Sequence, residues 1–300
     1  MGPWDEIKNS FKRGNYLLRL IYINVAVFLV LLIISAISYL LKNQLISETT
    51  ISFLAVPASF KILLLRPWTV ITYMFTHKDI WHILFNMLWL YWFGRIFLEY
   101  LDHKKLVAVY LLGGICGAIV YVLSFNVFPV FDEQIASSVA IGASASVMAI
   151  VIAIAAYVPN YTLNLFLFGR IRIIYIALTI FVLTSIMDFS VNSGGKLAHI
   201  GGGIFGYLYI LNVKKGRDIG KGINRIIDLI VTIFRPGKKM KVTYKKQASD
   251  YGYKASDYEY NKEKTERQAK INIILDKISK GGYDSLTKEE KEILFKESQK

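Results

Sequence analysis

The stretch VAIGASASVMAI, Val139 to Ile150, is apolar or small at almost every position, yet it contains two serines, Ser144 and Ser146. Small residues allow helices to pack closely within a lipid bilayer, and a serine hydroxyl there can bond to its own backbone. Packing is therefore the ordinary interpretation of a serine in such a helix. Whether Ser144 does more depends on the polar residues that the rest of the chain brings to the same depth.

The composition is that of an integral membrane protein. Of the 300 residues, 54% are hydrophobic, whereas soluble domains contain about 45–50% apolar residues. The net charge of +14 is concentrated late in the chain, where 22 of the 36 Lys and Arg residues follow Val213. An excess of cations on cytoplasmic segments explains this charge without a nucleic-acid partner. The single cysteine, Cys116, excludes a disulfide framework.

Six apolar runs are long enough to cross a bilayer, so we predict an all-α polytopic membrane protein with a six-helix bundle. Their approximate bounds are 17–41, 80–101, 105–126, 140–158, 171–188 and 197–213. The first run is too long to be the core of a cleavable signal peptide. Residues 1–213 thus form the predicted membrane core. Within it, the segment 42–79 is amphipathic but too broken to span, which favours a loop half embedded in the outer leaflet.

Basic residues divide unevenly among the connecting segments. They precede the first span, follow the second and fourth spans, and fill the tail, whereas one of the opposite loops carries Asp132 and Glu133. In the segments predicted to be cytoplasmic, the cations before the tail are Lys8, Lys12, Arg13, Arg19, Lys104, Lys105, Arg170 and Arg172. Because positive charge marks the cytoplasmic side, both termini are predicted to be cytoplasmic.

After Val213 the sequence becomes polar and basic. Residues 214–250 are predicted to form a basic interfacial helix and a linker, with the helix over 222–234 at the inner membrane surface. The sequence of this helix, GINRIIDLIVTIF, sets a charged face beside an isoleucine-rich face. That pattern is typical of helices that lie in the plane of the membrane.

Residues 251–300 are predicted to be a small cytoplasmic tail of two helices. Gly281 and Gly282 suit the end of the first helix. Thr287 and Glu290 form the capping-box pattern at the start of the second. Two interpretations of this tail stay open: a solvated helical hairpin, or a module that docks a cytoplasmic partner.

Four polar side chains stand out inside the predicted spans, where each such group is costly and needs a reason. His82 and Asn86 lie one turn apart on one face, near the start of the second span. Ser144 lies near the start of the fourth span and His199 near the start of the sixth. Even-numbered spans all run inward from the outer face, so at about 1.5 Å per residue these groups share nearly the same depth. We expect them to form a polar layer just below the outer surface.

The chemistry that suits this layer is acyl transfer. A serine becomes a nucleophile when a histidine within hydrogen-bond reach accepts its proton, which suggests these roles for Ser144 and His199. The anionic intermediate then needs hydrogen-bond donors. Suitable donors are His82, the Asn86 amide and the backbone N–H of Ser144.

Small residues on the fourth and sixth spans predict a close contact between them. Gly202 and Gly206 follow His199 at +3 and +7 and give the sixth span a seam of small residues. The facing surface of the fourth span would consist of Gly142, Ser146, Ala149 and Ala153. This contact is expected to set the distance between the serine and the histidine.

Three motifs occur in order on alternate spans. They are H-x-x-x-N at His82–Asn86, G-x-S at Gly142–Ser144 and A-H-x-x-G-x-x-x-G at Ala198–Gly206, with His77 upstream. In order and spacing they resemble the rhomboid intramembrane serine proteases, over about residues 17–213. The resemblance implies a protein of a bacterial inner membrane with its active site near the outer face.

By this resemblance the chain is a serine endopeptidase that cleaves transmembrane segments of other membrane proteins. Ser144 is expected to be the nucleophile, His199 the base, and His82 with Asn86 the oxyanion site. The expected partners are transmembrane protein substrates and the lipid bilayer, and no cofactor is expected. No carboxylate or thiol shares the layer of the histidines, so no metal site is expected either.

Two positions close to the expected nucleophile depart from the family pattern. A glycine often follows the nucleophilic serine, but Ala145 does so here, and its methyl group either crowds the oxyanion site or is tolerated. Met148 stands where many members carry an aromatic residue on the histidine, and a thioether orients an imidazole less firmly. These departures keep open a catalytically silent rhomboid-like protein that binds transmembrane clients. A solute transporter is less well supported, because paired broken-helix signals are missing.

Residues beside the expected site are assigned supporting roles. His77 is expected to cap or brace the loop near the outer interface. Ser146, nearly across the helix from Ser144, is expected to pack. The positions with a structural role near the site are Gly142, Ala145, Met148, Gly202, Gly206 and His77.

Overall fold

The computed structural model describes residues 16–165, 169–187, 189, 191–234 and 253–298. The chain divides into two compact units, Met1–Pro236 and Gly237–Lys300, and each is described by itself. The linker predicted after residue 234 lies outside the described residues, as do the cations Lys8, Lys12 and Arg13.

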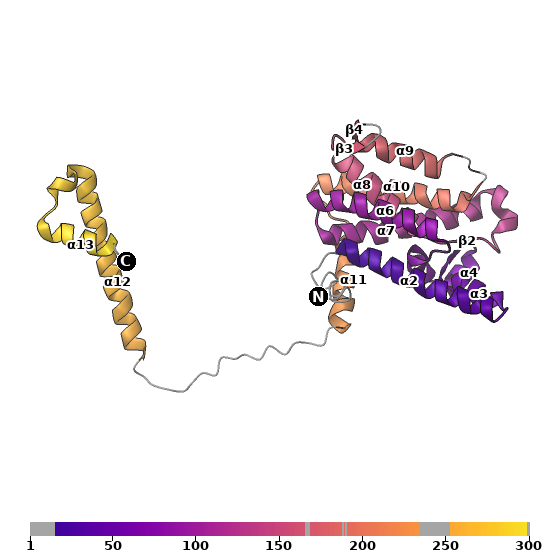
Figure 1. Cartoon of the computed structure of the whole chain (residues 1–300), viewed down its shortest axis with the longest axis horizontal. Coiled ribbons are helices and arrows are strands. Elements are labelled where there is room, and N and C mark those ends of the chain that lie inside the picture. Colours follow the sequence, from indigo (N-terminus) through magenta and orange to yellow (C-terminus); the bar gives the residue numbers. More distant parts are fainter. Residues whose placement is uncertain (1–15, 166–168, 188, 190, 235–252, 299–300) are drawn as a thin grey trace. The chain divides into compact units, whose positions relative to one another are not determined.

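The first unit is a bundle of six long helices that lie side by side (Figure 1). They are α2 (Tyr16–Leu40), α6 (Ile80–Tyr100), α7 (His103–Val127), α8 (Ser144–Tyr157), α9 (Ile173–Ser185) and α10 (Ser193–Lys214). The predicted all-α fold class is confirmed. Among the described helices, α2 and α7 are long and apolar enough by themselves to cross a membrane, and α8 and α9 are shorter apolar helices.

Side-chain caps fix the starts of three of these helices. Asp79 caps α6 and accepts a hydrogen bond from the backbone N–H of His82 at 2.8 Å. Asp102 and Asn192 cap α7 and α10 in the same way. Such caps satisfy N–H groups that have no partner within the helix, so the first turns of α6 and α10 are well defined.

The fourth predicted span, 140–158, begins later in the structure, because α8 starts only at Ser144. Strand β2 (Val139–Ala140) precedes it and pairs antiparallel with β1 (Val56–Pro57). Gly142 then takes a φ of +113°, which is far from the helical region. The helix therefore starts later than the apolar run alone predicts, because residues before it pair with a strand that is far away in sequence.

The fifth predicted span, 171–188, is also shorter, since α9 covers Ile173–Ser185. The residues before α9 form a hairpin of β3 (Thr162–Leu165) and β4 (Gly169–Arg172), with Thr162 opposite Arg172. This hairpin was not predicted. It lies at the end of the bundle where α8 ends and α9 begins (Figure 1).

Helix α8 lies at the centre of the bundle, and ten of its fourteen residues are buried. Glycines on its neighbours make this possible. A Cβ at Gly202 of α10 would collide with the carbonyl of Ala145, and a Cβ at Gly206 would collide with the carbonyl of Ala149. A Cβ at Gly117 of α7 would stand only 2.6 Å from the methyl of Ala145. The predicted glycine seam of α10 therefore does pack on α8, directly against its backbone.

Ser146 packs on α7, although its spacing along α8 predicts a place on the face toward α10. It is fully buried, and a Cβ at Gly114 of α7 would collide with its hydroxyl oxygen. The small residues of α8 are thus shared between two neighbours, which explains why this helix is enclosed on both sides.

The segment between α2 and α6 folds into short helices beside the bundle (Figure 1). These are α3 (Gln44–Leu54), α4 (Phe60–Leu65), α5 (Thr69–Thr72) and η1 (Tyr73–Phe75). Arg66 donates to the carbonyl of Ser52 at 3.4 Å, and the Trp68 indole N–H donates to the carbonyl of Phe53 at 3.0 Å. These bonds tie the turn after α4 to the end of α3. A further 3-10 helix, η2 (Pro129–Gln134), connects α7 to β2.

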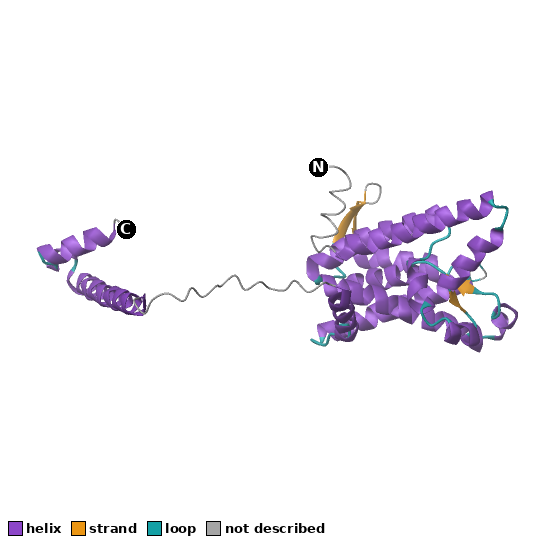
Figure 2. Cartoon of the chain, turned by 90° about the horizontal axis from the view of Figure 1, so that it is seen from below, coloured by secondary structure: helices purple, strands orange, loops and turns teal. Residues whose placement is uncertain are grey.

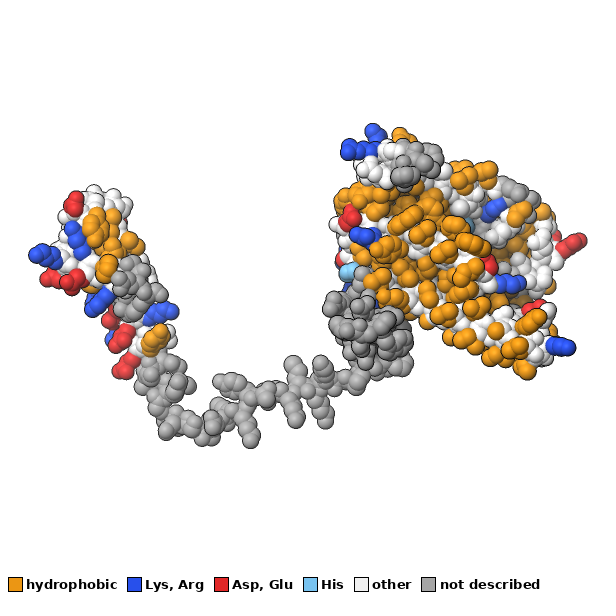
Figure 3. Space-filling model, viewed as in Figure 1, with side chains coloured by type: hydrophobic (Ala, Val, Ile, Leu, Met, Phe, Trp, Pro, Cys, Tyr) orange, Lys and Arg blue, Asp and Glu red, His pale blue; other side chains and the backbone are white. Residues whose placement is uncertain are grey.

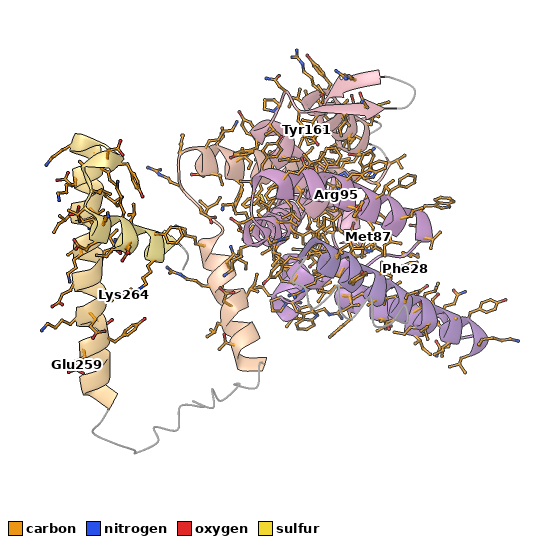
Figure 4. All side chains as sticks on the ribbon, turned by 60° about the vertical axis from the view of Figure 1, so that its left-hand side comes forward. Phe28, Met87, Arg95, Tyr161, Glu259 and Lys264 are labelled. Carbon is orange, nitrogen blue, oxygen red and sulfur yellow. The ribbon has the colours of Figure 1, made fainter. Side chains whose placement is uncertain are left out.

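Hydrophobic side chains cover much of the bundle surface, and the charged ones lie near its margins (Figure 3). Inside, Phe28 of α2 and Met87 of α6 are buried in the core between helices (Figure 4). An apolar surface around an apolar core is what a bilayer-embedded bundle requires.

The second unit contains α12 (Tyr253–Gly281), η3 (Tyr283–Ser285) and α13 (Lys288–Ser298). The predicted capping box is present: Glu290 accepts from the Thr287 N–H at 2.8 Å, and Thr287 Oγ1 accepts from the Glu290 N–H at 3.3 Å. Lys277 of α12 also donates to Glu290 at 2.7 Å, which holds the pKa of this carboxyl below its usual value. The two helices thus form a fixed hairpin, with Ile274 and Leu286 buried within it.

Candidate active site

A cavity of about 570 Å³ opens where α6, α8 and α10 begin. Its lining includes all four predicted polar residues, His82, Asn86, Ser144 and His199, together with Met148. The remaining walls come from β2 and from α9, which contributes Ile180 and Thr184. The structure therefore brings the predicted polar layer together in one place.

Ser144 is the first residue of α8. The first hydrogen bond within this helix runs from the N–H of Val147 to the carbonyl of Ala143 at 2.9 Å. The backbone N–H groups of residues 144–146 therefore have no partner inside the helix, and no side chain caps them. Such a helix start, with its partial positive charge, stabilises an anion beside it.

Gly142 shapes the approach to this helix start. Its N–H donates to the carbonyl of Tyr73 at 2.8 Å, which anchors the turn. A Cβ at Gly142 would lie 2.6 Å from Cε1 and 2.7 Å from Nε2 of His82. With its φ of +113°, only glycine suits this position, and its backbone lies directly against the His82 ring.

His77 links α6 to the start of α8. Its Nε2 lies 3.3 Å from the Asn86 amide nitrogen and accepts from the Ala143 N–H at 3.3 Å. Two donors at one ring nitrogen mean that Nε2 carries the lone pair and that the proton is on Nδ1. The ring of His77 also stands edge-on to His82, with centroids 5.0 Å apart. One N–H of the Asn86 amide is thus occupied, and the amide still has a second N–H.

The orientation of His199 is set by a backbone carbonyl. Its Nδ1 lies 3.1 Å from the carbonyl oxygen of Thr184, in the last turn of α9. A carbonyl can only accept, so Nδ1 carries the proton and Nε2 carries the lone pair. This is the tautomer that a general base requires, and a carbonyl does here what a carboxylate does in a catalytic triad. No residue type encodes such a contact, so the sequence could not reveal it.

Ser144 and His199 both belong to the described residues, and no hydrogen bond joins their side chains. Both residues line the same cavity, but the predicted direct contact between hydroxyl and imidazole is not formed. Catalytic hydrogen bonds are often long in the absence of substrate and tighten when it binds.

Lys196 is a second feature that sequence reasoning missed. It lies three residues before His199 on α10 and is only 9% exposed. Its Nζ donates to the carbonyl of Met187 at 2.6 Å, just after the end of α9. Together with the bond from His199 to Thr184, this contact ties α10 to the end of α9. A lysine at the start of an apolar span was the available signal, because a buried charge needs a specific partner.

The two departures from the family pattern have different surroundings. The methyl of Ala145 is buried against Gly117 of α7 and is not part of the cavity lining, so it points away from the cavity. Met148, in contrast, lines the cavity one turn after Ser144. Within the described ranges, no three His, Cys, Asp or Glu side chains lie close enough together to share a metal ion.

Comparison with known families agrees with this arrangement. The sequence model described as "Rhomboid domain" matches residues 65–215, which is half of the chain. This match includes every residue that lines the cavity and stops before the tail. The model described as "Family of unknown function (DUF6576)" matches residues 255–300. No curated protein matches the chain. With its helical bundle and its polar cavity at three helix starts, the chain belongs to the rhomboid family and is an integral membrane protein.

Proposed function

We propose that this protein is an intramembrane serine endopeptidase that cleaves transmembrane segments of other membrane proteins. Rhomboid proteins are generally serine proteases of this kind, which supports the reaction class. One observation carries the proposal for this chain. Ser144, at the uncapped start of α8, shares a cavity with a histidine whose Nδ1 is held by the Thr184 carbonyl.

In the proposed reaction, Ser144 Oγ attacks the carbonyl carbon of the scissile peptide bond, and its proton passes to Nε2 of His199. The negative charge on the former carbonyl oxygen is stabilised by the N–H of Ser144, by the free N–H of Asn86 and by His82. When the C–N bond breaks, the proton on Nε2 passes to the leaving amine. A water molecule then attacks the acyl-enzyme, gives its proton to Nε2, and restores the Ser144 hydroxyl.

We also propose that the cavity lies near the outer face and that both termini are cytoplasmic. Helix α8 runs from the cavity toward the β3–β4 hairpin, where Arg170 and Arg172 are exposed. The start of α7, with Lys104, and the end of α10, with Lys214, are also basic. Cations on the side away from the cavity support this orientation by the positive-inside rule. A bacterial inner membrane is the setting that we propose.

A transmembrane substrate needs a side opening to reach the cavity. We propose that it passes between α6 and α9. Trp81 and Phe85 of α6 line the cavity on one side and are exposed, and Ile180 and Thr184 of α9 line it on the other. The exposed residues Lys78 and Asp79 at its rim supply the polar surroundings that hydrolytic water requires.

One observation favours a second candidate, a silent rhomboid-like protein that binds transmembrane clients without cutting them. The hydrogen bond between Ser144 and His199 is not formed. This candidate explains the missing hydrogen bond without requiring that a substrate brings Ser144 and His199 together. The two candidates differ in whether Ser144 reacts.

The test is cleavage of a reporter transmembrane segment by the full-length protein in proteoliposomes. Ser144→Ala and His199→Ala are expected to abolish cleavage, and a fluorophosphonate is expected to label the wild type but not Ser144→Ala. Ser146→Ala is the matched control, because this serine is buried two residues away and does not line this cavity. Equal cleavage by the wild type and both dyad variants would refute the protease assignment. An unlabelled, inactive wild type that still binds the segment would establish the silent alternative.

A further inference from the structure

Helix α11 (Lys221–Phe234) follows α10 and runs across the end of the bundle instead of along it (Figures 1 and 2). Its connection to α10 is well fixed. Asp218 Oδ1 accepts from the Tyr209 hydroxyl at 3.1 Å and from the Gly220 N–H at 2.9 Å. A Cβ at Gly220 would lie only 2.7 Å from the methyl of Ala108 on α7, so the chain passes close to that helix here. The position of α11 is therefore defined by the bundle.

The apolar side of α11 is only partly covered by the protein. Ile223 and Ile227 are half-buried, whereas Ile226 is 55% exposed and Leu229 is 62% exposed. Because α11 crosses the ends of membrane helices, these exposed side chains lie at the level where the bilayer ends. An amphipathic helix in that position inserts its apolar face among the lipids and keeps its charges in the headgroup layer.

A polar pocket of about 460 Å³ lies between α11 and the start of α7. It is lined by Asp102, His103, Lys104, Asp218, Lys221, Asn224, Arg225 and Asp228. Two of its three carboxylates are paired with lysines, and the third accepts hydrogen bonds from two neutral donors. Asp102 pairs with Lys105, Asp218 accepts the two bonds described above, and Asp228 pairs with Lys104 at 2.7 Å.

Two cations of this pocket are left without an anion. Within the described part of the chain, neither Lys221 nor Arg225 forms an ion pair. They are one turn apart on α11, so both can reach the same ligand. A guanidinium presents a planar fork of donors that matches a phosphate, and an ammonium adds a point charge.

We propose that this pocket binds the phosphodiester of an anionic phospholipid of the cytoplasmic leaflet. Lys221 and Arg225 pair with the phosphate, and Ile226 and Leu229 contact the acyl chains beside it. The lipid is favoured over a soluble phosphate because the uncovered apolar residues adjoin the two cations on the same helix. The proposal rests on the membrane location and the orientation of the chain, and it is independent of proteolysis.

The experiment measures lipid binding to the full-length protein by native mass spectrometry in detergent, titrated with phosphatidylglycerol or phosphatidylcholine. The double variant Lys221→Ala/Arg225→Ala is expected to bind phosphatidylglycerol about tenfold more weakly, the effect of losing one charged hydrogen bond. Phosphatidylcholine carries a cationic choline beside its phosphate, so it is expected to bind weakly to the wild type and to change little in the variant. The matched control is Arg170→Ala/Arg172→Ala, which removes the same charge from the same end of the bundle but leaves the pocket intact.

A second variant tests the pocket in the opposite direction. Asp228→Asn releases Lys104 from its ion pair and removes a negative charge, so phosphatidylglycerol is expected to bind several-fold more tightly. Three results would overturn the proposal: equal loss in the Arg170/Arg172 control, no change in either pocket variant, or inorganic phosphate competing as well as the lipid. Cleavage of the reporter segment is measured in parallel, and lipid binding by an inactive protein would leave this proposal standing.

Discussion

Helices α8 and α9 are nearly equal in length and are both strongly apolar, but their surroundings differ. Ten of the fourteen residues of α8 are buried, whereas three of the thirteen residues of α9 are. Small residues account for the difference, because α8 is rich in Ala and Ser and is met by glycines from both sides. Helix α9 carries bulky side chains such as Leu178 and Leu183, which are exposed on the bundle surface.

This difference divides the supports of the proposed dyad between a tightly held helix and a loosely held one. Ser144 starts α8, where backbone contacts with α7 and α10 leave little freedom. His199 belongs to α10, but the carbonyl that orients its ring belongs to Thr184 of α9. The position of α9 therefore controls whether the base is aligned, while the nucleophile and its helix start stay in place. Substitutions can therefore disturb the two supports separately.

The largest effect is expected from Gly142→Ala, which disturbs the approach to α8. The new methyl would meet the His82 ring at 2.6 Å, and the backbone at φ +113° would be strained. Displacing a donor from the oxyanion site typically costs about 10²–10³ in rate, and we expect a loss of that size in kcat for reporter cleavage. Gly169→Ala is the matched control, since Gly169 also has a positive φ but has open space around it. Full activity of Gly142→Ala would contradict the assigned geometry.

The next prediction compares two adjacent glycines of α10. Gly202 faces the backbone of α8, which cannot move aside, whereas a Cβ at Gly203 would lie 2.9 Å from the Phe181 ring of α9. We expect Gly202→Ala to lower the free energy of unfolding by about 1–3 kcal/mol, as overpacking does. Gly203→Ala is expected to stay within about 0.5 kcal/mol of the wild type, because a side chain on a loosely packed helix can shift. Unfolding in mixed micelles measures both, and equal losses would show that α9 is as rigid as α8.

The tether between α10 and α9 is tested by Lys196→Met, which keeps the volume but loses the hydrogen bond to the Met187 carbonyl. The end of α9 is expected to loosen, so that the Thr184 carbonyl no longer holds His199. We expect kcat to fall about tenfold, a barrier increase of about 1.4 kcal/mol, with KM little changed because Lys196 does not line the cavity.

A purely structural role of Lys196 would not affect the base itself. Proton NMR of the His199 Nδ1–H therefore serves as the second measurement, and its hydrogen-bonded resonance is expected to disappear in Lys196→Met. Lys196→Arg retains a donor and is expected to restore most of the activity. A resonance that persists in Lys196→Met would rule out positioning through α9.

The helices of this fold could be predicted from sequence because each needs a long apolar run, and a run is a local property. The start of α8 could not, since residues 139–143 are as apolar as the helix after them. Their conformation is decided by pairing with Val56–Pro57 and by the unusual φ of Gly142. The β3–β4 hairpin was missed for a similar reason, because its apolar residues adjoin those of α9.

The site was predictable as far as helix direction determines it. His82, Ser144 and His199 converge because three helices begin at the same end of the bundle. What sequence could not supply is the support of the base, because a carbonyl such as that of Thr184 exists at every residue. The predicted hydrogen bond between Ser144 and His199 was wrong for this structure, since sharing a layer does not fix a distance to within 1 Å.

The smallest effect is expected from Leu183→Ala on α9, a side chain that is 54% exposed. In a bilayer this leucine contacts lipid in both the folded and the unfolded state, so its truncation leaves no cavity and transfers no apolar surface out of water. The free energy of unfolding is expected to change by less than about 0.5 kcal/mol. A loss above about 1 kcal/mol would mean that this face of α9 is covered by another protein surface. In that case the difference in burial between α8 and α9 would hold for the isolated chain and not for the protein in its membrane.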